Sequence, residues 1–374
     1  MKGTFLILLL FFSLALSPGV PRIVAIGDVH GDLNSFLSIL KTAQILDANG
    51  KWSGGKTILV QTGDVLDRGA QGRQALDLLM QLEQQAPKQG GRVYPLLGNH
   101  EVMNLMGDLR YVPAEEYANF ATQQSDKLLK QAYGTFTQFQ IRKAGERKLP
   151  APEFTPQMEE EWLKAHPRGF LEQRDAYGPR GKYGKWLRKQ NAVASVNQNI
   201  FLHGGISPKL APVTVQEIND RIRKELALFD RCKKAMEEQK VILPFFTFNE
   251  MIDAAKQELE IRKKDETLEA FLGLSGWLSV SPEGPLWFRG YAQWTEEELN
   301  AAVPALLETY KARHFIVGHT VMEKGDIRTR LNNAVIMIDT GMNRAFYPEG
   351  RASALEIQGE KLKAIYLNNS VALD

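Results

Sequence analysis

The stretch Arg22-Ile23-Val24-Ala25-Ile26-Gly27-Asp28-Val29-His30-Gly31-Asp32 joins an apolar run to a loop of glycine, aspartate and histidine. Apolar, β-branched runs of this length are typical of buried strands, and glycine permits the tight turn that follows. Asp28 and His30 stand two residues apart on one loop, so both side chains can reach the same ion. The stretch therefore predicts a buried strand with two metal-ligating side chains at its carboxyl end.

The same arrangement recurs at five more places in the chain. Apolar runs at residues 57–62, 92–97, 199–202, 314–317 and 334–338 each end in a polar loop. These loops are Gly63-Asp64-Val65-Leu66-Asp67-Arg68-Gly69, Gly98-Asn99-His100-Glu101, His203-Gly204-Gly205, Gly318-His319-Thr320 and Asp339-Thr340-Gly341. Residues 33–45 and 75–82, between the runs, show the apolar spacing of a helix face. Alternation of strand, loop and helix predicts an α/β fold with its ligands at the carboxyl ends of the strands.

The composition limits the classes of partner. The chain has 374 residues, 44% of them hydrophobic, which is enough to bury a substantial core. Its 46 basic and 44 acidic residues leave a formal net charge of +2. Such a balance gives no general attraction to nucleic acids, so we expect no nucleic-acid partner. Cys232 is the single cysteine, which excludes an intrachain disulfide, and we interpret it as a passive thiol.

The first 19 residues have the pattern of a secretory signal peptide. Lys2 precedes an apolar run from Phe5 to Leu16, and small residues follow that run. The run is shorter than the ~20 residues that span a bilayer. We therefore predict a cleavable signal at 1–19 and no stable membrane span after cleavage, with a short uncleaved membrane anchor as the alternative. The expected location is the secretory pathway or endoplasmic reticulum lumen in a eukaryote, or the periplasm in a bacterium.

We interpret residues 20–374 as one domain with two helical insertions. Residues 104 to about 190 are rich in Gln, Lys and Glu, and residues 213 to about 275 have the pattern of charged helices. Periodicity does not distinguish a lid over the site from peripheral packing, and both interpretations stay open.

The polar loops contain the residue types that hold two divalent ions. The predicted ligands are Asp28 and His30 for one ion, Asn99, His203 and His319 for the other, and Asp64 as the bridge between them. Two ions about 3.5–4 Å apart supply a strong nucleophile and clamp phosphoryl oxygens. The set predicts hydrolysis of a phosphate monoester by attack of a metal-bridging hydroxide. Mn, Fe and Zn all suit such ligands, and the pattern does not select among them.

Three further residues of these loops suit the other steps of that reaction. Arg68 offers a planar fork of donors that matches phosphate oxygens. His100 directly follows a predicted metal ligand, and as an imidazolium it can protonate the leaving alkoxide. Asp67 can hydrogen-bond His100 and keep it oriented.

The motifs GDVHGD, GDVLDRG, GNHE, HGG and GHT resemble those of the PPP phosphoprotein phosphatases, within the calcineurin-like metallophosphoesterases. The chain looks most like the Shewanella-like protein phosphatase subtype, on the segments 285–290, 317–320 and 338–341. The resemblance implies a β-sandwich flanked by helices, with the metals at one sheet edge. It gives the candidate residues the roles stated above and adds Arg289 as a second phosphate-binding arginine.

The resemblance implies a two-metal phosphoprotein phosphatase with a phosphoprotein as its partner. Leu97 and Gly318-His319-Thr320 depart from the pattern of most eukaryotic members, so the choice between phosphoserine/threonine and phosphotyrosine stays open. The alternative function is a dinucleotide polyphosphate hydrolase of the diadenosine tetraphosphatase kind, which shares these motifs. The sequence identifies no regulatory partner.

Overall fold

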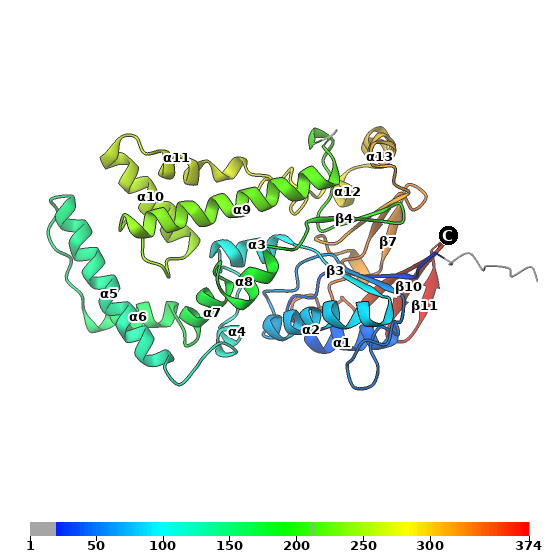
Figure 1. Cartoon of the computed structure of the whole chain (residues 1–374), viewed down its shortest axis with the longest axis horizontal. Helices are drawn as coiled ribbons and strands as arrows, with labels where there is room; N and C mark the ends of the chain where they lie inside the picture. Colours follow the sequence, from blue (N-terminus) through cyan, green and yellow to red (C-terminus); the bar gives the residue numbers. More distant parts are fainter. Residues whose placement is uncertain (1–19, 211–212, 374) are drawn as a thin grey trace, which may run out of the picture.

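The computed structural model describes residues 20–210 and 213–373, so the predicted signal peptide or anchor at 1–19 lies outside the described residues. Strands gather in one half of the molecule, together with α1, α2 and α13, and the other half is helical (Figure 1). The strands form two sheets, one of six strands and one of five. The prediction of an α/β fold with helical insertions is confirmed.

The six-stranded sheet has the order β11-β10-β9-β1-β2-β3. Its strands are β1 Ile23–Ile26, β2 Ile58–Gln61, β3 Arg92–Pro95, β9 Ser353–Gln358, β10 Lys361–Tyr366 and β11 Ser370–Ala372. The first three strands are parallel, and β9 pairs with β1 in antiparallel fashion. The apolar runs predicted β1, β2 and β3 to within two residues, whereas no strand was predicted at β9, β10 or β11.

The five-stranded sheet has the order β4-β5-β6-β8-β7. Its strands are β4 Val193–Val196, β5 Asn199–Leu202, β6 His314–Val317, β7 Arg328–Arg330 and β8 Val335–Met337. The strands β5, β6 and β8 are parallel and lie where the apolar runs predicted strands. The short strands β4 and β7 at the two edges were not predicted.

The two sheets pack face to face. Alternate residues of β1 point to opposite sides, so Ile23 and Ala25 lie in the core between the sheets while Val24 lies in the core under the helices. Phe201 and Ile316 of the second sheet belong to the same core cluster as Ile23. This packing is that of a β-sandwich, and it brings the carboxyl ends of both sets of parallel strands to one edge.

Helices cover the outer faces of the sandwich. These helices include α1 Leu33–Thr42, α2 Gly72–Gln85, α3 Asn99–Met106, α12 Gly290–Gln293 and α13 Glu296–Tyr310. The helix α1 contacts β9 and β10, and α2 contacts β3. The helix α3 begins at the predicted ligand Asn99, directly after the β3 loop.

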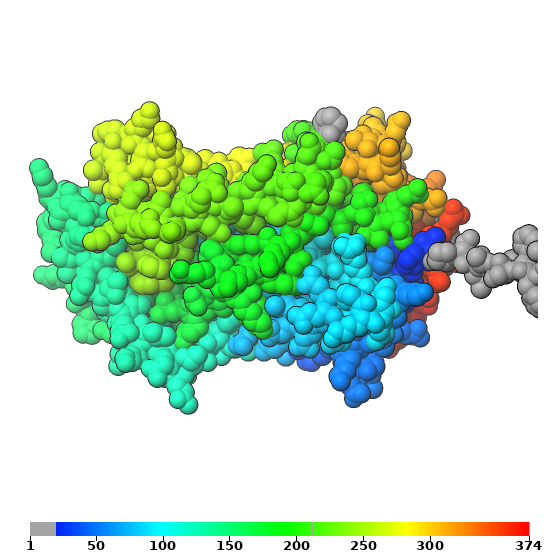
Figure 2. Space-filling model, viewed as in Figure 1, coloured from blue at the N-terminus to red at the C-terminus, as the bar shows by residue number. Residues whose placement is uncertain are grey.

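Both predicted insertion stretches consist mainly of helices. The first three residues of the first stretch, 104–106, belong to α3, which begins before the stretch. Their helices are α4 Ala114–Ala118, α5 Ser125–Glu146, α6 Pro156–Ala165, α7 Phe170–Tyr177, α8 Lys182–Leu187, α9 Val215–Glu238, α10 Phe248–Arg262 and α11 Glu266–Leu272. The helices α5, α6, α10 and α11 form the end of the molecule away from the sheets (Figure 2), whereas α9 runs back and contacts β4. A buried ion pair between Lys143 and Glu258, 2.8 Å apart, joins α5 to α10, so the two stretches pack on each other. Among the described residues, no helix combines the length and the apolar character that crossing a bilayer requires.

Candidate metal centre and active site

The carboxyl ends of five parallel strands meet at one edge of the sandwich. In one sheet β1, β2 and β3 lead to the loops of Asp28, Asp64 and Asn99, and in the other β5 and β6 lead to His203 and His319. Each side chain of the predicted metal-ligating set belongs to a residue that exposes 7% or less of its surface: Asp28, His30, Asp64, Asn99, His203 and His319. The fold thus brings all six candidates into one buried cluster.

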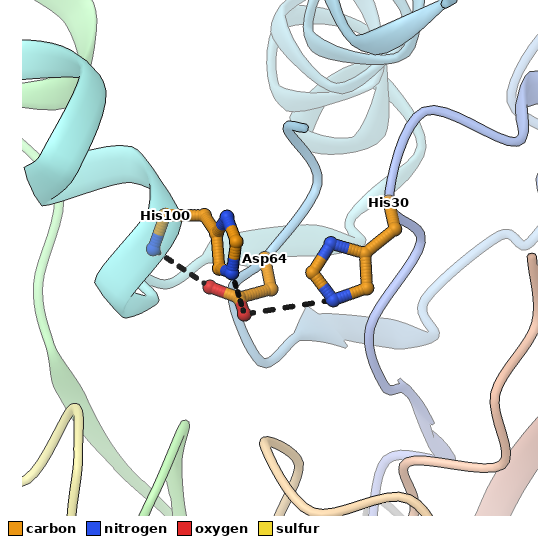
Figure 3. Close-up of side chains that lie close together, drawn as sticks. All are labelled: His30, Asp64 and His100. Carbon is orange, nitrogen blue, oxygen red and sulfur yellow. Dashed lines mark hydrogen bonds and ion pairs between the residues drawn. The ribbon is translucent and has the colours of Figure 1, made fainter. Parts of the chain in front are cut away.

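Asp64 lies at the centre of this cluster. Its Oδ2 is 3.2 Å from Nε2 of His203 and 3.7 Å from Nε2 of both His30 and His100. Figure 3 shows the rings of His30 and His100 directed at the Asp64 carboxylate. Two sets have ligand atoms within 4.8 Å of one another, namely His30, Asp64 and His100, and Asp64, His203 and His319. Asp64 belongs to both sets, which is the position that a bridging ligand requires.

His203 faces two oxygen atoms of the predicted ligand set. Its Nδ1 is 3.0 Å from the carbonyl oxygen of Thr62, which can only accept, so Nδ1 donates there. Its Nε2 lies 2.9 Å from Oδ1 of Asn99 and 3.2 Å from Oδ2 of Asp64. In the neutral tautomer of His203 this Nε2 has a lone pair, and a cation can join it to the two oxygens. The arrangement therefore fits a divalent ion.

His30 and His319 are held in the same way. Nδ1 of His30 donates to the carbonyl of Leu66 at 3.0 Å, and Nε2 of His319 donates to the carbonyl of Trp287 at 3.2 Å. Such outer hydrogen bonds fix the tautomer of a metal-binding histidine. Burial, the largest influence, lowers the pKa of His30 to about 3 and that of His319 to about 2, so both imidazoles are neutral and able to ligate.

Three carboxyl groups crowd the same buried space. Burial, and then the negative charges of Asp339 and Asp64, raise the pKa of Asp28 well above its usual value. Burial alone would also raise the pKa of Asp64, but the imidazoles of His203 and His100 hold it well below its usual value. Burial raises the pKa of Asp339 to about 6. A bound cation would reduce the repulsion between the negative charges of these carboxylates.

His100 and Asp67 form a buried pair. Nδ1 of His100 donates to Oδ2 of Asp67 at 2.6 Å, and the backbone N–H of His100 donates to Oδ1 of Asp64 at 3.0 Å. Burial lowers the pKa of His100, but the carboxylates of Asp64 and Asp67 outweigh that effect and the pKa lies above its usual value. The protonated ring keeps Nε2–H on the side away from Asp67, which suits a proton donor.

Arg68 stands at the mouth of the cluster, half-buried among aromatic rings. Its Nη1 lies 2.7 Å from Nε2 of His30 and also donates to the hydroxyl of Tyr347. The guanidinium carbon is 5.9 Å from the ring centre of Tyr111 and 5.0 Å from that of Phe346. The positively charged guanidinium of Arg68 thus lies against the lone pair of His30. A bound metal ion would also place positive charge there.

Arg289 reaches the site from the segment that precedes α12. Its Nη1 donates to the carbonyl of His319 and to Oγ1 of Thr320, both at 2.9 Å. The residue precedes α12, and Trp287, two positions earlier, accepts the hydrogen bond of His319. The segment that carries Arg289 therefore lies directly beside a predicted ligand.

Several residues in the loops of the site adopt backbone conformations that are rare for residues other than glycine. Positive φ angles occur at His30 (47°), Asp64 (56°), Asp67 (70°), Arg68 (67°) and His319 (68°). Such angles persist only where surrounding structure imposes them, and they cluster at functional sites.

Glu101 and Asp339 belong to the site but were not predicted to do so. The Glu101 carboxylate accepts from the backbone N–H groups of Asp64 (2.7 Å), Val65 (2.9 Å) and Gly98 (2.8 Å), and so ties the β2 loop to the β3 loop. Asp339 follows β8 as the ligands follow their strands, and that shared placement was the available signal.

The other histidines and the cysteine lie apart from the cluster. The ring of His166 stacks on Trp162 with centroids 3.9 Å apart, and Nδ1 of His314 is 2.7 Å from the carbonyl of Asn333. Cys232 is buried in α9, and burial raises the pKa of its thiol, which disfavours the reactive thiolate.

Residues 21–323 match the family model described as calcineurin-like phosphoesterase. Among curated proteins, the chain is 26% identical to Shewanella-like protein phosphatase 1 of Plasmodium berghei (strain Anka), over 92% of this chain and 74% of that protein. It is 28% identical to Shewanella-like protein phosphatase 2 of Arabidopsis thaliana, over 93% of this chain and 78% of the relative.

One solved structure is similar to this chain over most of its length. The cold-active protein-tyrosine phosphatase of a psychrophilic Shewanella species superposes with a TM-score of 0.61 and 26% sequence identity. The match covers 95% of this chain and 81% of that one. The likeness extends over the sandwich and the helical stretches alike.

Proposed function

The chain belongs to the calcineurin-like phosphoesterase family, and on that premise we propose that it is a two-metal phosphoprotein phosphatase. The observation that carries the proposal is the convergence of Nε2 of His203, Oδ1 of Asn99 and Oδ2 of Asp64 within one buried cluster. The Shewanella-like phosphatases among its relatives support a phosphoprotein as the substrate.

Six residues are proposed to hold the ions. Asp28 and His30 would bind one ion, Asn99, His203 and His319 the other, and Asp64 both. When bound, the ions would acidify a water to give a nucleophile at neutral pH and would offset the charge of the phosphoryl oxygens. The mixed carboxylate, imidazole and amide donors suit Mn, Fe or Zn.

The remaining residues would bind the phosphoryl group and move a proton. Arg68 at the mouth and Arg289 beside His319 would donate to phosphoryl oxygens. His100 would donate the proton on Nε2 to the leaving oxygen, because Asp67 holds Nδ1 and fixes the ring.

We propose that phosphotyrosine is the preferred residue. Tyr111 and Phe346 expose 42% and 54% of their surfaces, and both rings lie within 6 Å of the Arg68 guanidinium, so a planar aromatic side chain finds rings to contact while its phosphate reaches the guanidinium. The short side chain of phosphoserine would bring its phosphate past these rings without contacting them. The solved relative from Shewanella is a protein-tyrosine phosphatase, which supports the same preference.

Phe346→Ala should weaken the binding of phosphotyrosine selectively. Losing one aromatic contact of about 0.5–1.5 kcal/mol predicts a rise in KM of about 2- to 12-fold for a phosphotyrosine peptide. The KM for the same peptide with phosphoserine should not change. Leu149→Ala, which removes a side chain exposed to a similar extent after α5, is the control. Equal effects of Phe346→Ala on both peptides would contradict the proposed preference.

We further propose that the chain enters the secretory pathway or the periplasm, with anchoring by the same segment as the alternative. Lys2 and the apolar run from Phe5 to Leu16 support this. Mass determination of the protein recovered from cells tests it, since retention of residues 1–19 would contradict cleavage.

A further inference from the structure

A row of buried amide side chains leads from the helical stretch to the His100–Asp67 pair. Nε2 of Gln173 in α7 donates to Oδ1 of Asn104 at 2.9 Å, and Nδ2 of Asn104 donates to Oδ1 of Asp67 at 2.8 Å. Gln173 exposes 1% of its surface, and Asn104 and Asp67 each expose 2%. The three side chains therefore interact with one another rather than with solvent.

The Asp67 carboxylate, at the end of this row, determines which group donates in each of its hydrogen bonds. The Asp67 carboxylate can only accept, so the Asn104 amide must turn its nitrogen toward Asp67 and its oxygen toward Gln173. The second hydrogen of that nitrogen goes to the carbonyl of His100 at 3.0 Å. Gln173 must then donate, and the amide of Asn104 has no second orientation that satisfies all three contacts.

Asn104 also occupies the oxygen of Asp67 that His100 does not use. Oδ2 of Asp67 receives Nδ1–H of His100, and Oδ1 receives the Asn104 amide. Rotation about the terminal torsion of an aspartate meets only a broad, weak preference, so the second hydrogen bond is what prevents the carboxylate from turning.

We propose that Asn104 and Gln173 are positioning residues for proton donation by His100, an inference that rests on the proposed phosphatase function. Gln173 orients the Asn104 amide, Asn104 orients the Asp67 carboxylate, and Asp67 orients the His100 ring. The helical stretch that contains α7 therefore acts on the site through a buried row of hydrogen bonds behind it.

The test uses two substrates that differ in their need for a proton. A phosphotyrosine peptide requires protonation of its leaving oxygen more than dinitrophenyl phosphate, whose leaving group is stable as an anion. Gln173→Met and Asn104→Leu keep the approximate volume and remove the donors. We expect kcat on the peptide to fall about 10- to 100-fold, as for loss of comparable outer-shell partners, with unchanged KM and with turnover of dinitrophenyl phosphate nearly unchanged.

Asn219→Leu is the matched control. Asn219 is a buried amide in α9 that hydrogen-bonds the backbone of Ala192 and Val193, away from His100. Its loss should lower the melting temperature and leave the ratio of the two turnover rates as it is in the unaltered protein. If the Gln173 and Asn104 variants also leave that ratio unchanged, the positioning role is refuted.

A readout without metal or turnover completes the test. In metal-free protein with nitrogen-labelled histidine, NMR should show the Nδ1 proton of His100 at low field, because it lies in a short bond to a carboxylate. Gln173→Met should shift or broaden that signal, and an unmoved signal would overturn the inference. Lack of turnover of both substrates by the unaltered, metal-loaded protein would instead contradict the proposed function.

Discussion

Asp64→Asn should reduce kcat/KM on phosphopeptides by about 1000-fold or more, because metal ions contribute several kcal/mol of transition-state stabilisation and roughly 1.4 kcal/mol is tenfold in rate. Asp64 lies within reach of His30, His100 and His203 and is common to both sets of candidate ligands. The asparagine has the same shape and can still accept the backbone N–H of His100, so the fold should persist. Steady-state turnover and metal analysis of the purified variant measure the two effects.

The matched control for this change is Asp77→Asn. Asp77 lies on α2 and pairs with Lys182 at the surface, so the same loss of one negative charge there should leave turnover and metal content unchanged. Retention of two ions and full turnover by Asp64→Asn would refute Asp64 as the bridge.

His100→Asn should reduce kcat by about 100- to 10,000-fold while KM changes little, since general acid catalysis contributes an effect of that size to the chemical step. The side chain is buried and bonded to Asp67, and the new amide can keep a hydrogen bond to that carboxylate. Single-substrate kinetics on a phosphotyrosine peptide measure the change. Dinitrophenyl phosphate should lose much less, because its leaving group does not need the proton.

His314→Gln removes an imidazole that lies outside the cluster and whose Nδ1 contacts the carbonyl of Asn333. It should leave kcat unchanged on both substrates. An equal loss for the two substrates in His100→Asn would show that His100 acts otherwise than as a proton donor.

The elements that sequence predicted best are those whose pattern is local. The runs that became β1, β5 and β6 are short, apolar and followed by glycine-rich loops, so burial and turn chemistry agree at each of them. In β9 the burial runs over three successive residues before it alternates, which does not give the two-residue period of a half-buried strand. Edge strands such as β7 are stabilised by pairing with β8, a contact that the sequence does not reveal.

Some residues of the candidate site could likewise be identified from local sequence, and others could not. His30, Asp64 and His100 were identified because each stands in a polar loop after an apolar run. Arg289 was found only through resemblance to a family, since no such run precedes it. Asn104 and Gln173 are ordinary amides on helices, and they reach Asp67 only because α3 and α7 pack together across 69 residues of chain.

Turnover of a two-metal phosphatase depends on its bound metal ions. Metal-stripped protein should be inactive, and titration with Mn²⁺ should restore hydrolysis of matched phosphotyrosine, phosphoserine and phosphothreonine peptides up to two ions per chain, with phosphotyrosine hydrolysed fastest. Diadenosine tetraphosphate in the same series tests the alternative substrate class, and cleavage of that dinucleotide alone would overturn the phosphoprotein assignment. Full peptide turnover by the metal-stripped protein would contradict the account.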